Sequence, residues 1–185
     1  MITDEQILKK AQQLYDLVEK KWINEIFLSP SWIFIVILII CTYALFLYLV
    51  DKKRITVILL YGSLLAVAFQ VYDSIGEQLG YWATLKDTLP IKTNYFLGNF
   101  TLIPLSGMLV YQYTSSWKSY LFWITVWGGL LAFVFYKLVL QYIKFFVYIK
   151  PFSTTIDFLL FLTVGIIVRW IVVSLLKLEE KRKLR

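Results

Sequence analysis

Asp73 and Glu77 form the acidic pair through which this 185-residue sequence could do chemistry. In a helix, their i, i+4 spacing places both carboxylates on one face, and paired carboxylates can act as general acid and base. No positioned nucleophile accompanies them. The chain has no His and a single cysteine, Cys41, which excludes the usual zinc sites and any His-based triad. We therefore expect no metal and no cofactor, and our leading hypothesis is a protein without enzymatic activity.

Six further polar residues lie near this pair in the topology that the sequence predicts. An ionisable side chain in hydrocarbon is costly unless it pairs, snorkels or faces water, so each is a functional candidate. Together they can form one polar cluster at the outer mouth of a helical bundle. This cluster is either a solvated interfacial set with a structural ion pair, or a site for a small ligand, a headgroup or an ion. Its predicted members are Asp73, Glu77, Asn94, Asn99, Lys137, Gln141, Lys144 and Asp157.

Two basic residues are candidates at the inner end. Arg169 lies inside the last apolar stretch, about two turns from its end, and Lys118 opens the fourth stretch on the same side. Either the long stem of Arg169 snorkels to the inner headgroups beside Trp170, or its guanidinium pairs internally or contacts an anion. We assign Arg169 and Lys118 as an inner anion or headgroup contact.

Five long apolar stretches, almost free of charge, must position these residues. A helix needs roughly 20 apolar residues to cross the hydrocarbon layer, and 59% of the chain is hydrophobic. The sequence therefore predicts an all-α fold, an integral membrane bundle of five transmembrane helices in residues 31–176. The predicted crossings are about 32–50, 55–74, 94–113, 119–141 and 156–176. The connection 142–155 is either interfacial or partly re-entrant.

Residues 1–30 have the pattern of an amphipathic helix. Thr3 can cap it, and Gln6 completes a capping box. Apolar residues then recur every three or four positions, from Ile7 to Ile26, and Pro30 ends the pattern. Such a helix lies flat at the membrane interface or packs against a partner. We predict an N-terminal amphipathic interfacial helix, with membrane lipids as partners and a protein partner or a homo-oligomer as further possibilities.

The net charge of +7 comes largely from basic residues at the ends of apolar stretches. This placement indicates topology and contact with anionic lipid, and it argues against nucleic-acid binding. Basic residues are densest in the short loops 51–54 and 114–118 and in the tail 177–185. The opposite loops hold equally many, spread over far more residues. The density predicts an outside N-terminus, an inside C-terminus and a basic cytoplasmic tail at 177–185.

Five strings of this sequence together form a recognisable pattern. The pattern resembles an uncharacterised family of small polytopic membrane proteins of spore-forming Gram-positive bacteria. The resemblance implies a bacterial plasma membrane or spore membrane and carries no activity with it. The family usually has an acidic residue and a proline where Tyr136 and Lys137 stand here. The strings are Asp51–Arg54, Tyr72–Trp82, Met108–Ser119, Leu131–Phe135 and Arg169–Ile171.

Our leading functional hypothesis is a non-enzymatic multi-pass membrane protein that acts as a binding, accessory or assembly component. The alternatives are a small oligomeric transporter or channel and an intramembrane lipid-modifying enzyme that uses Asp73 and Glu77. A transporter requires polar groups that continue across the midplane, and an enzyme requires an open lateral cleft near Asp73. A binding or structural protein predicts a polar cluster closed by its own contacts.

Overall fold

The computed structural model describes residues 3–90 and 97–183, and these residues are mainly helical. The prediction of an all-α protein is confirmed, with two short strands added, β1 (Trp82–Thr84) and β2 (Phe146–Tyr148). The six α-helices are α1 (Asp4–Lys21), α2 (Pro30–Leu49), α3 (Ile55–Gln78), α4 (Ile103–Tyr113), α5 (Trp117–Gly129) and α6 (Ser153–Lys183). Three helices are extended by π-helical segments: Trp22–Ile26 follows α1, Gly98–Leu102 precedes α4, and Leu130–Leu140 follows α5.

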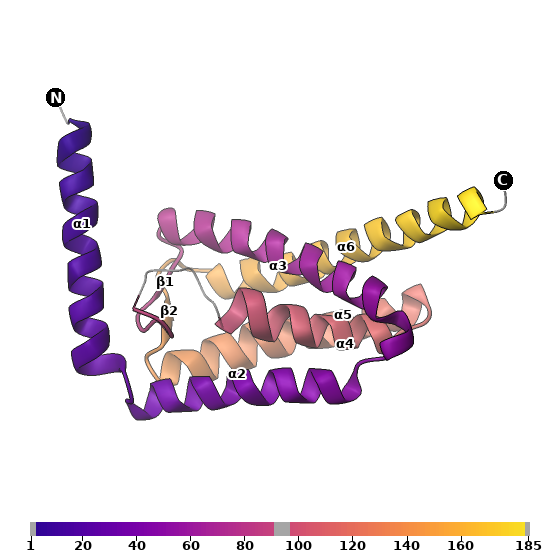
Figure 1. Cartoon of the computed structure of the whole chain (residues 1–185), viewed down its shortest axis with the longest axis horizontal. Coiled ribbons are helices and arrows are strands. Elements are labelled where there is room, and N and C mark those ends of the chain that lie inside the picture. Colours follow the sequence, from indigo (N-terminus) through magenta and orange to yellow (C-terminus); the bar gives the residue numbers. More distant parts are fainter. Residues whose placement is uncertain (1–2, 91–96, 184–185) are drawn as a thin grey trace.

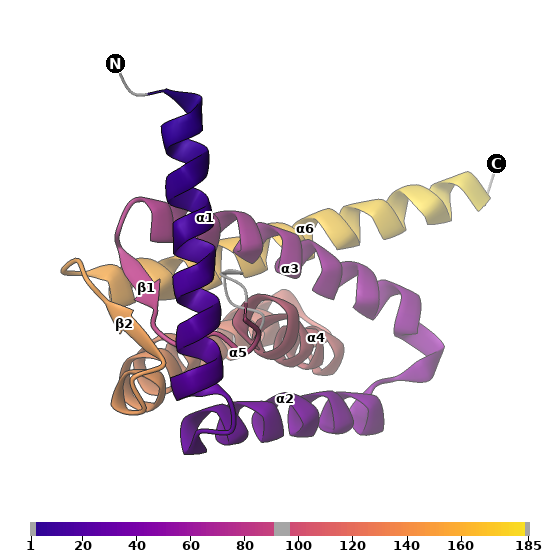
Figure 2. The same cartoon turned by 60° about the vertical axis from the view of Figure 1, so that its left-hand side comes forward.

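Helices α2 to α6 form a bundle, and α1 stands across one end of it (Figure 1). Helix α4 packs against α2, α3 and α5, while α6 packs against α3 and α5. The N-terminal half of α1 projects past α3 in both ribbon views, and the last turns of α6 project from the opposite end (Figures 1 and 2). The charged segments at the two ends of the chain therefore lie at opposite ends of the bundle.

Four helical segments are long and apolar enough to cross a membrane. Their outward surfaces carry large apolar side chains, such as Leu47, Phe122 and Leu138, which are all more than half exposed. Exposed apolar surface on this scale is typical of a surface that contacts lipid, so these helices support a membrane protein. The four segments are Pro30–Leu49, Lys52–Gln78, Trp117–Leu140 and Ser153–Lys183.

The fifth predicted crossing, about 94–113, is not established. Its first residues lie outside the described part of the chain, which resumes with a five-residue π-helical segment, Gly98–Leu102, and the 11-residue helix α4. Much of α4 is buried among the other helices, including Pro104, Gly107 and Met108. A crossing by α4 remains a prediction.

Local sequence signals explain where the first helices begin. The predicted capping box is present, because Gln6 N donates to Thr3 Oγ1 at 3.3 Å and Thr3 N donates to Gln6 Oε1 at 3.2 Å. Helix α2 begins at Pro30, whose missing N–H is no loss in a first turn. The Ser29 hydroxyl caps this helix by accepting from Trp32 N at 3.3 Å. Pro30 therefore opens α2, after a π-helical segment, Trp22–Ile26, has continued α1.

Strands β1 and β2 pair antiparallel across one end of the bundle, beside α1 (Figure 2). Trp82 faces Tyr148 in the register, and Thr84 faces Phe146. The connection 142–155 therefore contributes a strand. The core between the helices is aromatic and aliphatic, and Tyr61, Ile58 and Tyr120 are among its fully buried side chains.

Candidate functional site

Asp73 lies near the C-terminal end of α3 and is buried, with 8% of its surface exposed. Its Oδ1 accepts a hydrogen bond from Trp82 Nε1 at 2.8 Å. Its Oδ2 accepts from Asn99 Nδ2 at 3.1 Å, and the same amide nitrogen donates to Gln70 Oε1 at 3.3 Å. Both carboxylate oxygens are thus satisfied by neutral donors from β1 and from the π-helical segment before α4.

Asp157 lies in the first turns of α6, at the same end of the bundle as Asp73, and is 5% exposed. Its Oδ1 accepts from the Tyr72 hydroxyl at 2.5 Å, and its Oδ2 accepts from the Tyr148 hydroxyl. Burial raises the pKa of Tyr148 well above its ordinary value, and the neighbouring Asp157 carboxylate raises it further. The phenol of Tyr148 therefore stays protonated and can donate to Asp157.

The third carboxylate, Glu77, is half-buried one turn beyond Asp73. Its Oε1 accepts from the backbone N of Thr84 at 2.8 Å. We call Asp73, Glu77 and Asp157 the carboxylate cluster. Each member binds a donor from the sheet, so the cluster fastens β1 to α3 and β2 to α6.

A cavity of about 20 Å³ lies between Asp73 and Asp157. This volume holds about one water molecule and is far too small for a lipid or an organic substrate. Its polar lining comes from the two carboxylates, Tyr72 and Asn99. The remaining lining is large and mostly aromatic: Phe69, Trp82, Ile103, Tyr136, Phe146 and Phe161.

The carboxylate cluster is closed by hydrogen bonds. The ion pair Lys183–Glu179 is exposed and lies at the far end of α6, away from the cluster. Within the described residues, neither Asp73 nor Asp157 contacts a Lys or Arg. Buried carboxylates without a cation must be satisfied by hydrogen bonds, and the indole and phenol donors supply them.

The remaining predicted members of the cluster lie elsewhere. Lys137 and Lys144 are exposed and contact none of the three carboxylates. Gln141 is half-buried below β2, where its amide can donate to the carbonyl of Lys137 at 3.0 Å and accept from Tyr148 N at 3.1 Å. Asn94 lies outside the described residues. The structure thus brings Asp73, Glu77, Asn99 and Asp157 together and leaves both lysines at the surface.

Of the side-chain donors to Asp73 and Asp157, Asn99 was a predicted member of the cluster, whereas the three aromatic donors were not. Trp82, Tyr72 and Tyr148 are aromatic residues near the ends of apolar stretches, where such rings also serve as interfacial anchors. Trp82 and Tyr148 lie on the two short strands, and Tyr72 lies on α3, so contacts between segments far apart in the chain bring these polar atoms to the carboxylates. A buried Tyr or Trp usually hydrogen-bonds through its O–H or N–H, and this tendency was the sequence signal that could have indicated these three donors.

At the other end of the bundle, the Arg169 guanidinium turns inward. Its Nη1 donates to Thr114 Oγ1 at 3.0 Å and to Thr114 O at 3.3 Å, and its Nη2 donates to Thr114 O at 3.3 Å and to Ser115 O at 3.4 Å. The guanidinium carbon also lies 4.3 Å from the centre of the Tyr120 ring. These carbonyls follow the C-terminus of α4, where a positive charge is favourable. Arg169 is therefore held internally, whereas Lys118 is exposed.

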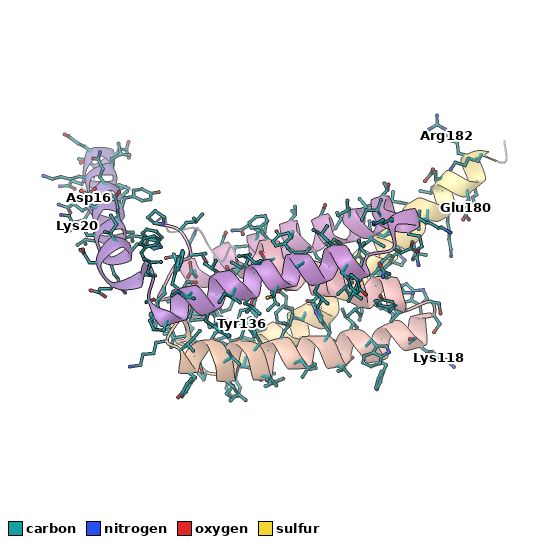
Figure 3. All side chains as sticks on the ribbon, turned by 60° about the horizontal axis from the view of Figure 1, so that its bottom comes forward. Asp16, Lys20, Lys118, Tyr136, Glu180 and Arg182 are labelled. Atoms are coloured by element: carbon teal, nitrogen blue, oxygen red, sulfur yellow. The ribbon has the colours of Figure 1, made fainter. Side chains whose placement is uncertain are left out.

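Charged side chains otherwise gather at the two extremities of the molecule. Figure 3 shows Asp16 and Lys20 on α1 at one end, and Lys118, Glu180 and Arg182 at the other. Tyr136, which is labelled in the same view, lies within the bundle and is 5% exposed.

The loop after β1 holds α1 in place. Lys21 Nζ donates to the carbonyl of Leu85 at 3.3 Å, and Trp22 Nε1 donates to the carbonyl of Asp87 at 3.1 Å. At the start of α2, Trp32 Nε1 donates to the carbonyl of Thr88 at 3.0 Å. Hydrogen bonds thus connect the carboxylate cluster, the sheet, the loop and α1 in sequence.

Comparison with known proteins finds no match to a family model, to a curated protein or to a solved structure. The resemblance to small membrane proteins of spore-forming bacteria therefore stays a prediction. What the chain does has to be inferred from its own residues.

Proposed function

We propose that this chain is a non-enzymatic multi-pass membrane protein that acts as an assembly component, presenting α1 flat on the membrane surface. The observation that carries the proposal is that the apolar face of α1 is turned toward the end of the bundle. Val18 and Trp22 line a cavity against residues 83–87, so this face of the helix is turned toward the end of the bundle. Ile7, Ala11 and Leu14 recur on the same face at helical spacing.

Because α1 lies across the end of the bundle, the apolar face of its projecting half can contact the membrane lipid. When the apolar helices cross a membrane, the projecting half of α1 lies along the surface of the lipid (Figure 1). Ile7 and Leu14, 56% and 53% exposed, then enter the interfacial layer. The helix carries four acidic and four basic residues, so apolar burial rather than net charge supplies its affinity. Its outward face, with Asp16 and Lys20, remains for a protein partner or a second copy.

The closed carboxylate cluster supports this function over the alternatives. A lipid-modifying enzyme needs an opening beside Asp73 that admits a substrate, and the space there holds about one water molecule. A transporter needs exchangeable polar groups, whereas the oxygens of Asp73 and Asp157 are occupied by side chains of the protein. The cluster instead holds the sheet that positions α1.

Lipid exposure of single sites on α1 tests the proposal. In a Cys41→Ser background, spin labels are placed at Leu14→Cys and, as a matched control on the opposite face, Asp16→Cys. In lipid vesicles we expect the label at position 14 to collide with oxygen, which is concentrated in lipid, and the label at 16 to collide with a water-soluble nickel complex. Water accessibility of both labels would contradict the proposal.

The proposed orientation places the N-terminus outside and the C-terminus inside, in a bacterial plasma or spore membrane. The basic loop residues and the tail lie at the end opposite to α1, which agrees with the positive-inside rule. Ser115 and Lys144 are both exposed and lie at opposite ends. In intact cells, an impermeant thiol reagent should modify Lys144→Cys and leave Ser115→Cys unmodified. The reverse pattern would invert the orientation.

A further inference from the structure

We infer that the segment Ile149–Phe152, which joins β2 to α6, is a membrane anchor whose apolar side chains enter the lipid at the level of the glycerol and the headgroups. We call it the anchor segment. Ile149 and Phe152 are 60% and 79% exposed. The inference goes beyond the proposed function, because it concerns α6 and the connection before it and requires nothing of α1.

Helix α6 presents one apolar stripe to its surroundings. Exposed residues recur along it every three or four positions, a spacing that places them on one face of a helix. Thr163 contributes the one hydroxyl of this stripe and donates it to the carbonyl of Leu159 at 2.8 Å. A face without charge, whose hydroxyl is satisfied within the helix, is suited to contact hydrocarbon. The stripe consists of Ile156, Leu159, Thr163, Ile167 and Trp170.

Phe152 extends this stripe by one turn. It lies four residues before Ile156, and its carbonyl accepts from Ile156 N at 2.9 Å. The 18 residues from Phe152 to Trp170 rise roughly 27 Å, close to the roughly 30 Å of the hydrocarbon layer. Trp is enriched at the edges of this layer, and Phe enters the same region from interfacial segments. The two rings, 79% and 62% exposed, therefore mark the two edges of the lipid on α6.

The backbone of Phe152 has a conformation that glycine normally takes. Its φ of 65° lies in the left-handed region, where a bulky residue is an outlier. Residues in such conformations cluster at functional positions, where the surrounding structure holds them. Packing within the chain does not account for the ring, because most of its surface is exposed. Contact with lipid does account for it, since the left-handed backbone turns a large apolar ring to the outside.

The backbone of the anchor segment is already suited to a lipid environment. Ile149 N and Lys150 N both donate to the carbonyl of Tyr81, at 2.8 and 3.2 Å, and Pro151 has no N–H. Lys150 Nζ donates to the carbonyl of Leu79 at 2.7 Å and lies 4.2 Å from the centre of the Tyr81 ring. Paired donors and apolar side chains are the combination that a lipid-embedded segment requires.

This assignment moves the α6 span about one turn toward the sheet, from the 156–176 that the sequence predicts to 152–170. It also makes the connection 142–155 interfacial and not re-entrant. Arg169 then lies at the inner edge of the hydrocarbon beside Trp170. The next charged residue is Lys177, about two turns further on, in the part of α6 that projects from the bundle (Figure 1).

The depth of spin labels along the stripe tests the inference in vesicles of phosphatidylethanolamine and phosphatidylglycerol. The ratio of collisions with oxygen to collisions with a water-soluble nickel complex reports depth. We expect the greatest depth at 159 and 163, which straddle the midpoint between the two rings, smaller and equal depths at 152 and 170, and water exposure at Gln78, an exposed polar residue near the same end of the bundle. In the Cys41→Ser background, the labelled variants are Phe152→Cys, Leu159→Cys, Thr163→Cys, Trp170→Cys and Gln78→Cys.

Three results at position 152 would overturn the anchor. Nickel exposure equal to that at 78 would place the segment in water. A depth equal to that at 159 would make the connection re-entrant. Shielding from both reagents would show that a protein partner covers the ring. The labels at 14 and 16 on α1 are read separately, so that water exposure of both overturns the proposed function and leaves the anchor standing.

Variants of Phe152 separate anchoring from folding, with a label at Ile149→Cys as the reporter. Phe152→Asn tolerates the left-handed backbone but removes the ring, and it should shift the label from oxygen toward nickel exposure. Phe152→Trp retains a ring and should leave the label unaltered. The melting temperature of Phe152→Asn in detergent should not fall, because the ring is not packed within the chain. An unshifted label in Phe152→Asn, or a fall in its melting temperature, would overturn the role assigned to the ring.

Discussion

Replacing Trp82 by Phe should loosen the sheet from the bundle while leaving the helices folded. The indole Nε1 lies 2.8 Å from Oδ1 of Asp73, and the two residues are 2% and 8% exposed. Phe keeps a ring but has no N–H, so one oxygen of a buried carboxyl group loses its donor, which costs about 1–3 kcal/mol. The smaller ring loses about 1 kcal/mol more of apolar burial. We expect a total loss of about 2–4 kcal/mol in the free energy of unfolding.

Two measurements check this prediction. Reversible unfolding in detergent gives the free energy, and hydrogen exchange of the Leu85 and Ile149 amides reports on the sheet, since both donate to backbone carbonyls there at 2.9 and 2.8 Å. Trp123→Phe is the matched control, because Trp123 is 51% exposed. A double-mutant cycle with Asp73→Leu, which removes the acceptor and keeps a similar volume, isolates the bond. Additivity within about 0.5 kcal/mol, or exchange as slow as in the control, would refute the role assigned to this contact.

Three further predictions concern other parts of the structure. Gly76→Ala places a methyl group against the Trp82 ring and should lower the melting temperature in detergent, whereas Gly129→Ala, whose nearest neighbour atom would be 3.8 Å away, should not. Arg169→Lys cannot make both Nη contacts and should cost about 1–3 kcal/mol of unfolding free energy. The raised pKa of Tyr148 means that its stabilisation is complete below the ordinary value of about 10 and is lost only above it. The difference in unfolding free energy between the unaltered chain and Tyr148→Phe should therefore stay constant up to about pH 10 and shrink beyond.

The helices were accessible to sequence reasoning because their signals are local. The Thr3–Gln6 capping box and the long uncharged stretches each depend on residues close together in the chain. Strands β1 and β2 were not predicted, because each has three residues and too little alternation to be recognised. Their pairing joins segments about sixty residues apart, and only the folded bundle brings these together.

The sequence indicated the acidic residues of the site and the amide donor Asn99, but not the aromatic donors. Asp73 and Asp157 stand out because a carboxylate at the end of an apolar stretch is expensive. Lys137 was expected beside them from its spacing along the chain, but spacing alone does not give the rotation of a helix, and its side chain lies outside the cluster. An aromatic donor such as Trp82 has a second common role at a membrane interface, so its partner could not be assigned from residue type.

Helix α6 shows why the two ends of the bundle need separate polar contacts. Asp157 and Arg169 are both buried in this one helix, and twelve residues at 1.5 Å each place them roughly 18 Å apart along its axis. They are too far apart to neutralise each other, so each must be satisfied where it lies. Tyr72 and Tyr148 do so for Asp157, and the carbonyls after α4 do so for the two Nη atoms of Arg169. Sliding or rotating α6 would break both sets at once. Asp157 and Arg169 therefore fix the depth and rotation of α6. Through Tyr148, Asp157 also fixes β2, and so the sheet that positions α1.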